Sequence, residues 1–464
     1  MRGARLRVIA TVVAAASVLL AQGAPAASAS VASTASTAST ARVASKAPPP
    51  PQHDHFYKPP AGYASTAPGT ILRSRPVQVA TFATLPQNIS AWQLLYRTTN
   101  YKGKPEATVT TVLLPAGGKP RALLSYQIAE DAVAPQCAPS YELRSGVGPS
   151  GAINQAELLL IDAAVAEGFA VSIPDYEGPG GDFGAARQPG YAILDGIRAA
   201  EQFTPLELDG LSTPVGIWGY SGGSLVSGWA AQVQPSYAPD INLLGVAVGG
   251  FVTNLAQAVT QINGGVGAGL IVSVLSGVAR TVPALAAAIK TYVTPAGQAL
   301  LAQGASQCET TNVLDYPFTN LDNYLTIPLT QFLALPAIKA ALTGLDLGSS
   351  APTAPLFVYH AVNDELIPIA GADATVSGYC ADGDSVTYTR DLLSEHATLA
   401  LIGAPAALNW LTQRLTGGAV PQGCTTTTVP SMLLTVGGLE DLPSFLVADI
   451  LALLDQPIGI GTFG

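Results

Sequence analysis

The sequence predicts an α/β fold, in which a mostly parallel central sheet lies between helices and carries an inserted helical cap. Two observations predict this fold. Short runs of β-forming residues alternate with helical segments from Ala122 to Val248, which is how parallel strands joined by helices appear in a sequence. The alternation then stops, and residues 251–349 are rich in Ala, Leu, Val and Gly with helical periodicity. We therefore expect the cap in that segment.

Composition limits the classes of partner. The 464 residues are 48% hydrophobic and only 11% charged, so a large core and broad apolar surface patches are expected. Such patches suit a lipid-like substrate, although an Ala-rich composition produces the same bias. The net charge of −10 disfavours nucleic acid and anionic membrane surfaces as partners, and it favours a neutral substrate.

The first residues have the pattern of a secretory signal. Three arginines precede the apolar run Val8–Leu20. Either Ala27–Ala29 or Ala24–Ala26 provides a cleavage site of small residues. We therefore expect residues 1–29 to be a signal peptide and the protein to be secreted into the extracellular space. The apolar run is short for the alternative, an uncleaved membrane anchor.

Two further segments complete the expected organisation. Residues 30–52 are rich in Ala, Ser, Thr and Pro and are predicted to be a disordered linker, which leaves 53–464 as the folded domain. Within the cap, Gly264–Val278 is almost wholly apolar, but it is short, glycine-rich and internal. We therefore expect no stable membrane span, and any contact with a lipid interface to be transient.

The individual elements follow in chain order. Strands are predicted at Val77–Phe82, Trp92–Thr98, Ala107–Leu114, Ala122–Ile128, Ala170–Ile173, Val215–Trp218, Leu243–Val248, Pro355–His360 and Ser385–Tyr388. Helices are predicted at Gln155–Glu167, Tyr191–Gln202, Ser224–Val233 and Ala406–Leu415. The tail after Gly417 has little pattern from which to predict elements.

Residues Gly219–Gly223 fit the pattern G-x-S-x-G between a predicted strand and a predicted helix. In this motif the serine lies on a strained turn, small neighbours let strand and helix approach closely, and the helix N-terminus stabilises negative charge. The pattern alone is common in a glycine-rich chain, where a turn with a bystander serine is the alternative. Its strand–turn–helix setting predicts that Ser221 is a catalytic nucleophile.

An acid and a histidine complete a predicted triad. The apolar run that begins at Leu356 leads into a loop with Asp364, where such a fold places the carboxylate that orients the histidine, and Glu365 is the neighbouring alternative. Of the four histidines, two lie beside the predicted linker and His360 ends a strand, which leaves His396 as the general base. The order serine, acid, histidine is the order expected for a nucleophile elbow.

Stabilisation of an oxyanion requires two backbone N–H donors. One should be Gly222, next to the nucleophile, and the other is predicted in the loop after Ile128, where Asp131 is the candidate. The alternative for the acidic pair at 130 and 131 is a solvated turn or a helix cap. The sequence has no evident cluster of metal ligands, so neither a metal nor a cofactor is expected.

Export makes disulfide bonds an expectation. The four cysteines, Cys137, Cys308, Cys380 and Cys424, contain no C-x-x-C pair and allow three pairings. The short separation of the last two favours a bond between them, which would leave the first two as the second pair.

At these residues the chain resembles the secretory lipases of the Candida antarctica lipase A type, within the α/β-hydrolase superfamily. The resemblance covers about His55 to Gly417 and depends on the segments Phe56–Gly62, Pro68–Arg75, Cys137–Ser140, Tyr191–Arg198 and Gly219–Gly223. It implies an α/β-hydrolase fold with an acyl tunnel under the cap. It also implies triad roles for Ser221, Asp364 and His396, oxyanion roles for Asp131 and Gly222, and the disulfides Cys137–Cys308 and Cys380–Cys424. One departure is Ala361, where related hydrolases often have Gly.

The residues and the resemblance together predict a secreted carboxylic ester hydrolase, a triacylglycerol lipase, that acts through an acyl-enzyme intermediate on lipid or other esters. A serine acyltransferase or a peptidase on the same fold is the alternative. The scarcity of acids in the cap disfavours an aminopeptidase, which needs them to hold a free amine. A non-catalytic binding protein is disfavoured because all three triad residues are retained.

Overall fold

The computed structural model describes residues 47–148 and 151–459. The predicted signal peptide, residues 1–29, and residues 30–46 of the predicted linker lie outside this part of the chain. The described chain starts within the predicted linker, where Pro51–His53 forms the 3-10 helix η1 and Pro51 is buried. Regular structure therefore begins slightly before the boundary predicted at residue 53.

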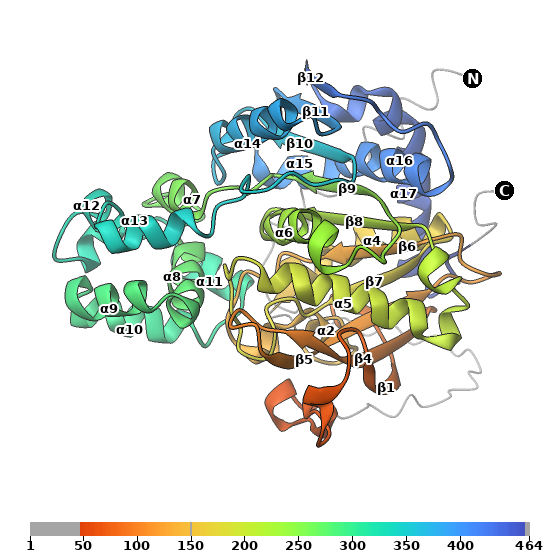
Figure 1. Ribbon diagram of the computed structural model, residues 1–464, viewed down its shortest axis with the longest axis horizontal. Coiled ribbons are helices and arrows are strands. Elements are labelled where there is room, and N and C mark those ends of the chain that lie inside the picture. Colours follow the sequence, from red (N-terminus) through yellow and green to blue (C-terminus); the bar gives the residue numbers. More distant parts are fainter. Residues whose placement is uncertain (1–46, 149–150, 460–464) are drawn as a thin grey trace, which may run out of the picture. The chain divides into compact units, whose positions relative to one another are not determined.

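Ten strands of the described chain form one mixed sheet, in the order β1-β4-β5-β7-β6-β8-β9-β10-β11-β12 (Figure 1). The pairings that join β1, β4, β5 and β7 are antiparallel, and those from β7 through β6 to β12 are parallel. The bounds are β1 Ile71–Val77, β4 Ser90–Thr99, β5 Pro105–Leu114, β6 Leu123–Gln127, β7 Ala170–Pro174, β8 Val215–Tyr220, β9 Leu243–Gly249, β10 Leu356–Ala361, β11 Val386–Asp391 and β12 Cys424–Val429.

Helices cover both faces of the sheet, because successive side chains of a buried strand point to opposite faces and both need apolar cover. In β10, Val358 packs in the core that contains α5 and α6, whereas Phe357 and Tyr359 pack in the core that contains α4, α16 and α17. The helices outside the cap segment are α2 Pro139–Glu142, α3 Ala152–Ala156, α4 Leu158–Ala166, α5 Gln188–Gln202, α6 Gly222–Tyr237, α14 Ile369–Asp382, α15 His396–Ile402, α16 Ala404–Leu415 and α17 Val436–Leu453.

The segment between β9 and β10 is helical. Its helices, drawn in green and cyan in Figure 1, are α7 Leu255–Ile262, α8 Gly269–Thr281, α9 Pro283–Tyr292, α10 Pro295–Gly304, α11 Glu309–Asp315, α12 Leu329–Leu333 and α13 Pro336–Thr343. The apolar stretch Gly264–Val278 contains most of α8, and its residues Ile271, Val272 and Val278 are fully buried. Among the helices of the described residues, none is long and apolar enough to cross a membrane.

Two sequence-based expectations for elements need correction, and the tail contains elements that were not predicted. The strand predicted at Val77–Phe82 is wrong: β1 ends at Val77, and the positive φ angles of Phe82 and Ala83, 50° and 56°, turn the chain after the short strand β2 Ala80–Thr81. The helix predicted at Gln155–Glu167 is two helices, α3 and α4, that meet at Glu157. The tail beyond Gly417 contains an edge strand and a long helix, β12 and α17.

Candidate active site

The carboxyl edge of the parallel strands brings the predicted site residues together. Asp131 follows β6, Ser221 follows β8, Asp364 follows β10, and His396 lies after β11 at the start of α15. Parallel strands place their carboxyl ends at one edge of a sheet, and the crevice outside this edge is where α/β proteins bind ligands. The fold thus brings Ser221 and His396, which are 175 residues apart in the sequence, into hydrogen-bond distance.

Ser221 lies on the turn between β8 and α6, with φ 52° and ψ −123°. This backbone conformation is costly for a residue with a Cβ atom, and it persists only where the surroundings determine it. The glycines on both sides make it feasible, because a Cβ atom on Gly219 would clash with the carbonyl of Gly223, and one on Gly223 would clash with the carbonyl of Gln127. The spacing of the motif therefore reflects backbone contact between strand, turn and helix.

His396 bridges the serine and the acid. Its Nε2 atom lies 2.9 Å from Ser221 Oγ, and its Nδ1 atom lies 2.8 Å from Asp364 Oδ2. The backbone of His396 is also held on both sides, since its N–H donates to Glu365 Oε2 at 3.0 Å and its carbonyl accepts from Tyr220 Oη at 2.6 Å. With a proton on Nδ1, the ring donates to the carboxylate and accepts from the serine hydroxyl.

The geometry distinguishes Asp364 from Glu365. The second carboxylate oxygen of Asp364 accepts from the backbone N–H groups of Leu366 and Ile367, at 3.0 and 2.7 Å, so its carboxylate is fixed toward the imidazole. Glu365 contacts the backbone of His396 and not its ring. This supporting role of Glu365 was missed from the sequence, as was that of Tyr220, because both depend on how two distant loops meet.

The charges of the site favour an ionised acid beside a basic imidazole. Burial raises the pKa of Asp364, but the hydrogen bond from His396 and its positive charge outweigh burial and hold the pKa below the ordinary value. Burial lowers the pKa of His396, but the hydrogen bond and charge of Asp364, with the charges of Glu365 and Asp131, raise it above the ordinary value. The imidazole is therefore a stronger proton acceptor than a free histidine.

Gly222 and Asp131 lie against each other beside the serine. Gly222 is the first residue of α6, and a Cβ atom there would clash with Asp131 Oδ1. Asp131 has a positive φ of 39° and is buried, and burial raises the pKa of its carboxyl to about 6. Asp131 therefore lies against the residue that follows Ser221, and the oxyanion roles of both residues stay a prediction.

The contacts of His360 indicate a structural role. Its Nδ1 atom accepts from the N–H of Phe251 at 2.9 Å, and its Nε2 atom lies 2.9 Å from the carbonyl of Ile367. With both nitrogens used by the backbone, the ring is neutral, and burial lowers its pKa. Through Ile367 it fixes the loop that carries Asp364.

Comparison with known proteins identifies the family. A family model described as "Secretory lipase" matches residues 143–423, which is more than half of the chain. The chain belongs to the secretory lipase family. The X-ray structure of Candida antarctica lipase A matches with a TM-score of 0.76 and 29% sequence identity, over 89% of this chain and 99% of that chain. The fold is therefore that of an α/β-hydrolase, and the resemblance stated from the sequence is confirmed.

The relatives of this chain include proteins named as lipases and one named as an inactive lipase. Lipase A of Arthroderma benhamiae is 40% identical over 427 residues, which cover 90% of this chain and 90% of that protein. A protein of Mycobacterium tuberculosis named "probable inactive lipase" is 43% identical over 399 residues, which cover 84% of this chain and 89% of that protein. Membership of the family therefore identifies the fold, and whether this chain is active depends on the residues of its own site.

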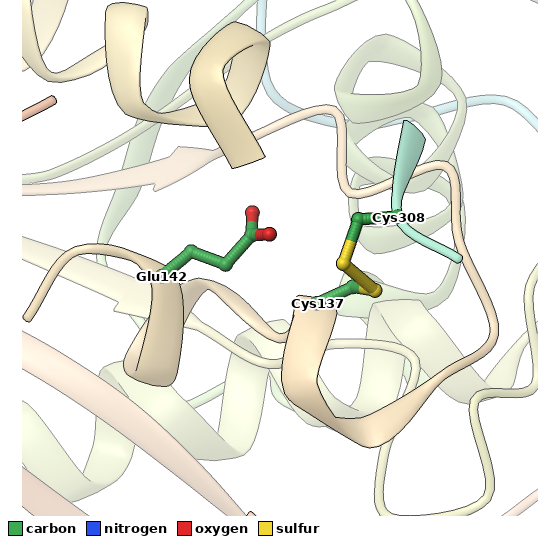
Figure 2. A group of neighbouring side chains, drawn as sticks. All are labelled: Cys137, Glu142 and Cys308. Carbon is green, nitrogen blue, oxygen red and sulfur yellow. A yellow bond between two sulfur atoms is a disulfide. The ribbon is translucent and has the colours of Figure 1, made fainter. Parts of the chain in front are cut away.

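The cysteines of this member of the secretory lipase family form the two disulfides that the sequence favoured. Cys137 and Cys308 are bonded with an S–S distance of 2.07 Å, and Cys380 and Cys424 with 2.02 Å. Among the described residues, one group of metal-type ligands lies close together, namely Glu142 with the first cysteine pair (Figure 2). Both sulfur atoms are used in the disulfide, so this group offers a metal only one carboxylate.

A cluster of buried acids surrounds the loop that carries Asp131, and sequence reasoning missed it. Its members have raised pKa values, and all but the half-buried Glu157 are buried: Glu130, Asp131, Glu142, Glu157, Asp175, Glu177 and Glu309. Burial is the main cause in each, and it raises the pKa of Glu142 and Glu157 to about 8 and that of Asp175 to about 7. No local spacing could reveal this cluster, because its members come from separate loops and helices.

We expect these acids to make the protein less stable as the pH rises. Their folded-state pKa values lie above the unfolded values near 4, so the unfolded chain releases its protons first and unfolding becomes more favourable between about pH 4 and pH 8. Chemical denaturation at pH 5 and pH 8.5 should show a lower free energy of unfolding at the higher pH, by a few kcal/mol.

The matched variant for this prediction is Glu142→Gln, because the glutamine keeps an acceptor for Asn154 Nδ2, which donates to Glu142 at 2.9 Å, and removes the ionisation. In this variant the free energy of unfolding should change less between pH 5 and pH 8.5, and its value at pH 5 should stay close to that of the wild type. Equal unfolding free energies at both pH values would contradict the prediction.

Proposed function

We propose that this chain is a catalytically active, secreted carboxylic ester hydrolase that cleaves lipid esters with a Ser-His-Asp triad. The observation that carries the proposal is the continuous chain Ser221 Oγ–His396 Nε2 at 2.9 Å and His396 Nδ1–Asp364 Oδ2 at 2.8 Å. A serine on a strained elbow, a general base within hydrogen-bond reach and an acid that orients the base are the three parts that acyl transfer by a serine requires.

The reaction has two stages in this arrangement. His396 accepts the proton of Ser221 as its Oγ atom attacks the ester carbonyl, and the same proton passes to the departing alcohol. Asp364 stabilises the imidazolium that forms in between. The backbone N–H groups of Gly222 and Asp131 hold the negative oxygen of the tetrahedral intermediate. Water activated by His396 then hydrolyses the acyl-enzyme and restores the serine.

The assignment of a lipid ester as substrate is supported by the family and by the apolar cap segment. The helices α7 to α10, α12 and α13 contribute buried aliphatic residues to the same core as α5 and α6. Two small apolar hollows lie among α7–α13, and Leu275 of α8 lines both. An apolar lining of this kind suits acyl chains, which need apolar cover and no polar partner. Export after removal of residues 1–29 completes the proposal, and the two disulfides suit that compartment.

A panel of p-nitrophenyl esters with acyl chains of about two to eighteen carbons tests the proposal. The purified chain should hydrolyse them, with the highest kcat/KM for the longer acyl chains. A peptide anilide and an added alcohol acceptor should give no faster reaction. Hydrolysis of the anilide alone would point to a peptidase, and acyl transfer to the alcohol in preference to water would point to an acyltransferase. Absence of every reaction would contradict the proposal and match the relative named as inactive.

A further inference from the structure

The loop that carries Asp131 is held by the core at its start. Tyr176 Oη donates to the carbonyl of Ile128 at 2.6 Å and accepts from the N–H of Glu130 at 3.0 Å. Glu157 Oε1 accepts from the N–H of Ala129 at 2.9 Å. These bonds stop at residue 130, so they do not by themselves hold Asp131, whose positive φ needs support from the chain on its other side.

Arg280 supplies contacts on that other side. It lies near the end of α8, and its Nη1 atom donates to the carbonyl of Val133 at 2.8 Å, two residues beyond Asp131. The same atom donates to the carbonyls of Gly181, at 3.1 Å, and Gly180 in the loop after β7. One guanidinium from the segment between β9 and β10 therefore joins the loop after β6 to the loop after β7.

Glycines bring α8 close enough to these loops for that contact. A Cβ atom on Gly277 would lie 2.5 Å from the carbonyl oxygen of Phe183, and one on Gly184 would lie 2.7 Å from Val278 Cγ2. Gly181 has a positive φ of 58°, and a Cβ atom there would clash with the carbonyl of Val133. Backbone and helix thus touch directly, which leaves Arg280 little freedom relative to its acceptors.

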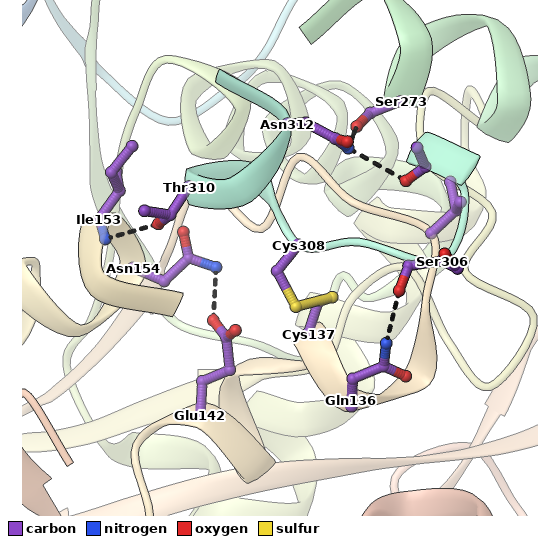
Figure 3. The surroundings of a disulfide bond; sticks show 12 residues. Gln136, Cys137, Glu142, Ile153, Asn154, Ser273, Ser306, Cys308, Thr310 and Asn312 are labelled. Carbon is purple, nitrogen blue, oxygen red and sulfur yellow. Dashed lines mark hydrogen bonds between the residues drawn. A yellow bond between two sulfur atoms is a disulfide. The ribbon is translucent and has the colours of Figure 1, made fainter. Parts of the chain in front are cut away.

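A second connection joins the far end of the same loop to the cap segment. The disulfide links Cys137 in the 3-10 helix η4, Pro135–Cys137, to Cys308 just before α11. Beside it, Gln136 Nε2 donates to the carbonyl of Ser306 at 2.9 Å, as Figure 3 shows. The loop from 128 to 137 is thus held by the core at its start and by the cap segment in its middle and at its end.

We propose that Arg280 is a positioning residue for ester hydrolysis: from α8 it holds the loop that carries Asp131 in the conformation that directs the Asp131 N–H at the oxyanion. The inference depends on the proposed function and extends it, because it makes the cap segment part of the transition-state machinery and not only a cover for the acyl chain. An oxyanion donor has to be within a fraction of an ångström of its position, so a loop released at Val133 loses that accuracy.

The test compares Arg280→Met, which keeps the aliphatic stem and removes the donors, with the wild type. A matched control is Lys290→Met, which removes an exposed cation from the neighbouring helix α9. For Arg280→Met we expect kcat on a p-nitrophenyl ester to fall about 10- to 100-fold with KM changed less than about 3-fold, because the donor acts on the transition state. Hydrogen–deuterium exchange of the peptide from 128 to 137 should become faster, while exchange in α17 stays unchanged.

Two further results decide the proposal. Arg280→Lys, which restores one charged donor, should recover part of kcat and part of the exchange protection. Unchanged exchange in the loop, or faster exchange with an unchanged kcat, would overturn the proposal, as would an equal loss of kcat in Lys290→Met. If the wild-type chain hydrolyses no ester, the proposed function fails separately, and the exchange measurement still decides whether Arg280 orders the loop.

Discussion

Replacement of Ser221 by Ala is expected to lower kcat for ester hydrolysis by about 10⁶-fold, because the nucleophile is the member of a triad that no neighbour can replace. The substitution removes only the Oγ atom, whose partner in the structure is His396 Nε2 at 2.9 Å. The backbone bond from the N–H of Ser221 to the carbonyl of Gly249, at 2.9 Å, is kept. The turn should therefore remain folded, and substrate should still bind.

The measurement is the initial rate on a long-chain p-nitrophenyl ester, together with covalent labelling by a fluorophosphonate. Ser221→Ala should give neither hydrolysis nor labelling. Ser236→Ala, at the other end of α6, is the matched control and should react like the wild type, since Ser236 Oγ bonds only to the carbonyl of Val233 at 3.2 Å. A Ser221→Ala protein that hydrolyses the ester at the wild-type rate would refute the mechanism.

Replacement of Asp364 by Asn is expected to lower kcat by about 10⁴-fold. The amide of an asparagine would donate to His396 Nδ1, where the carboxylate now accepts at 2.8 Å. The imidazole would then carry its proton on Nε2 and could not accept the proton of the serine. Because Asp364 also raises the pKa of His396, the residual activity should begin at a lower pH than in the wild type.

Glu365→Gln provides the comparison that separates the two neighbouring acids. A glutamine can still accept from the N–H of His396, as Glu365 Oε2 does at 3.0 Å, so we expect a loss of less than about 10-fold in kcat. Rates over pH 5–9 for both variants give the measurement. A larger loss for Glu365→Gln than for Asp364→Asn would assign the triad acid to Glu365.

The local sequence pattern was sufficient to predict much of the fold and to select the candidate triad. The elbow at Gly219–Gly223 could be read because it needs small residues at fixed positions between a strand and a helix. His396 could be selected because the chain has few histidines. The strands β6 to β10 were visible as apolar runs, since a strand buried on both faces has little room for polar residues.

The same local reasoning failed where tertiary contacts, and not the local residue types, determine the backbone conformation. The turn at Phe82 and Ala83, with positive φ angles, lies in a run of β-forming residues and has no glycine to mark it. The edge strand β12, Cys424–Val429, takes its conformation from pairing with β11, and its residues are largely exposed. Neither position has a local residue preference strong enough to predict the result.

The sequence was sufficient to predict the α/β class, the family, the helical segment after β9 and the serine, histidine and acid to be tested, because each depends on periodicity or on a motif of fixed spacing. The packed structure was needed to show that Asp364 and not Glu365 faces the imidazole, that buried acids gather around Asp131, and that Arg280 of α8 reaches the loop after β6. These features join loops that are distant in the chain. Their distances and burial arise only when the sheet and the cap segment pack together, so no local pattern could encode them.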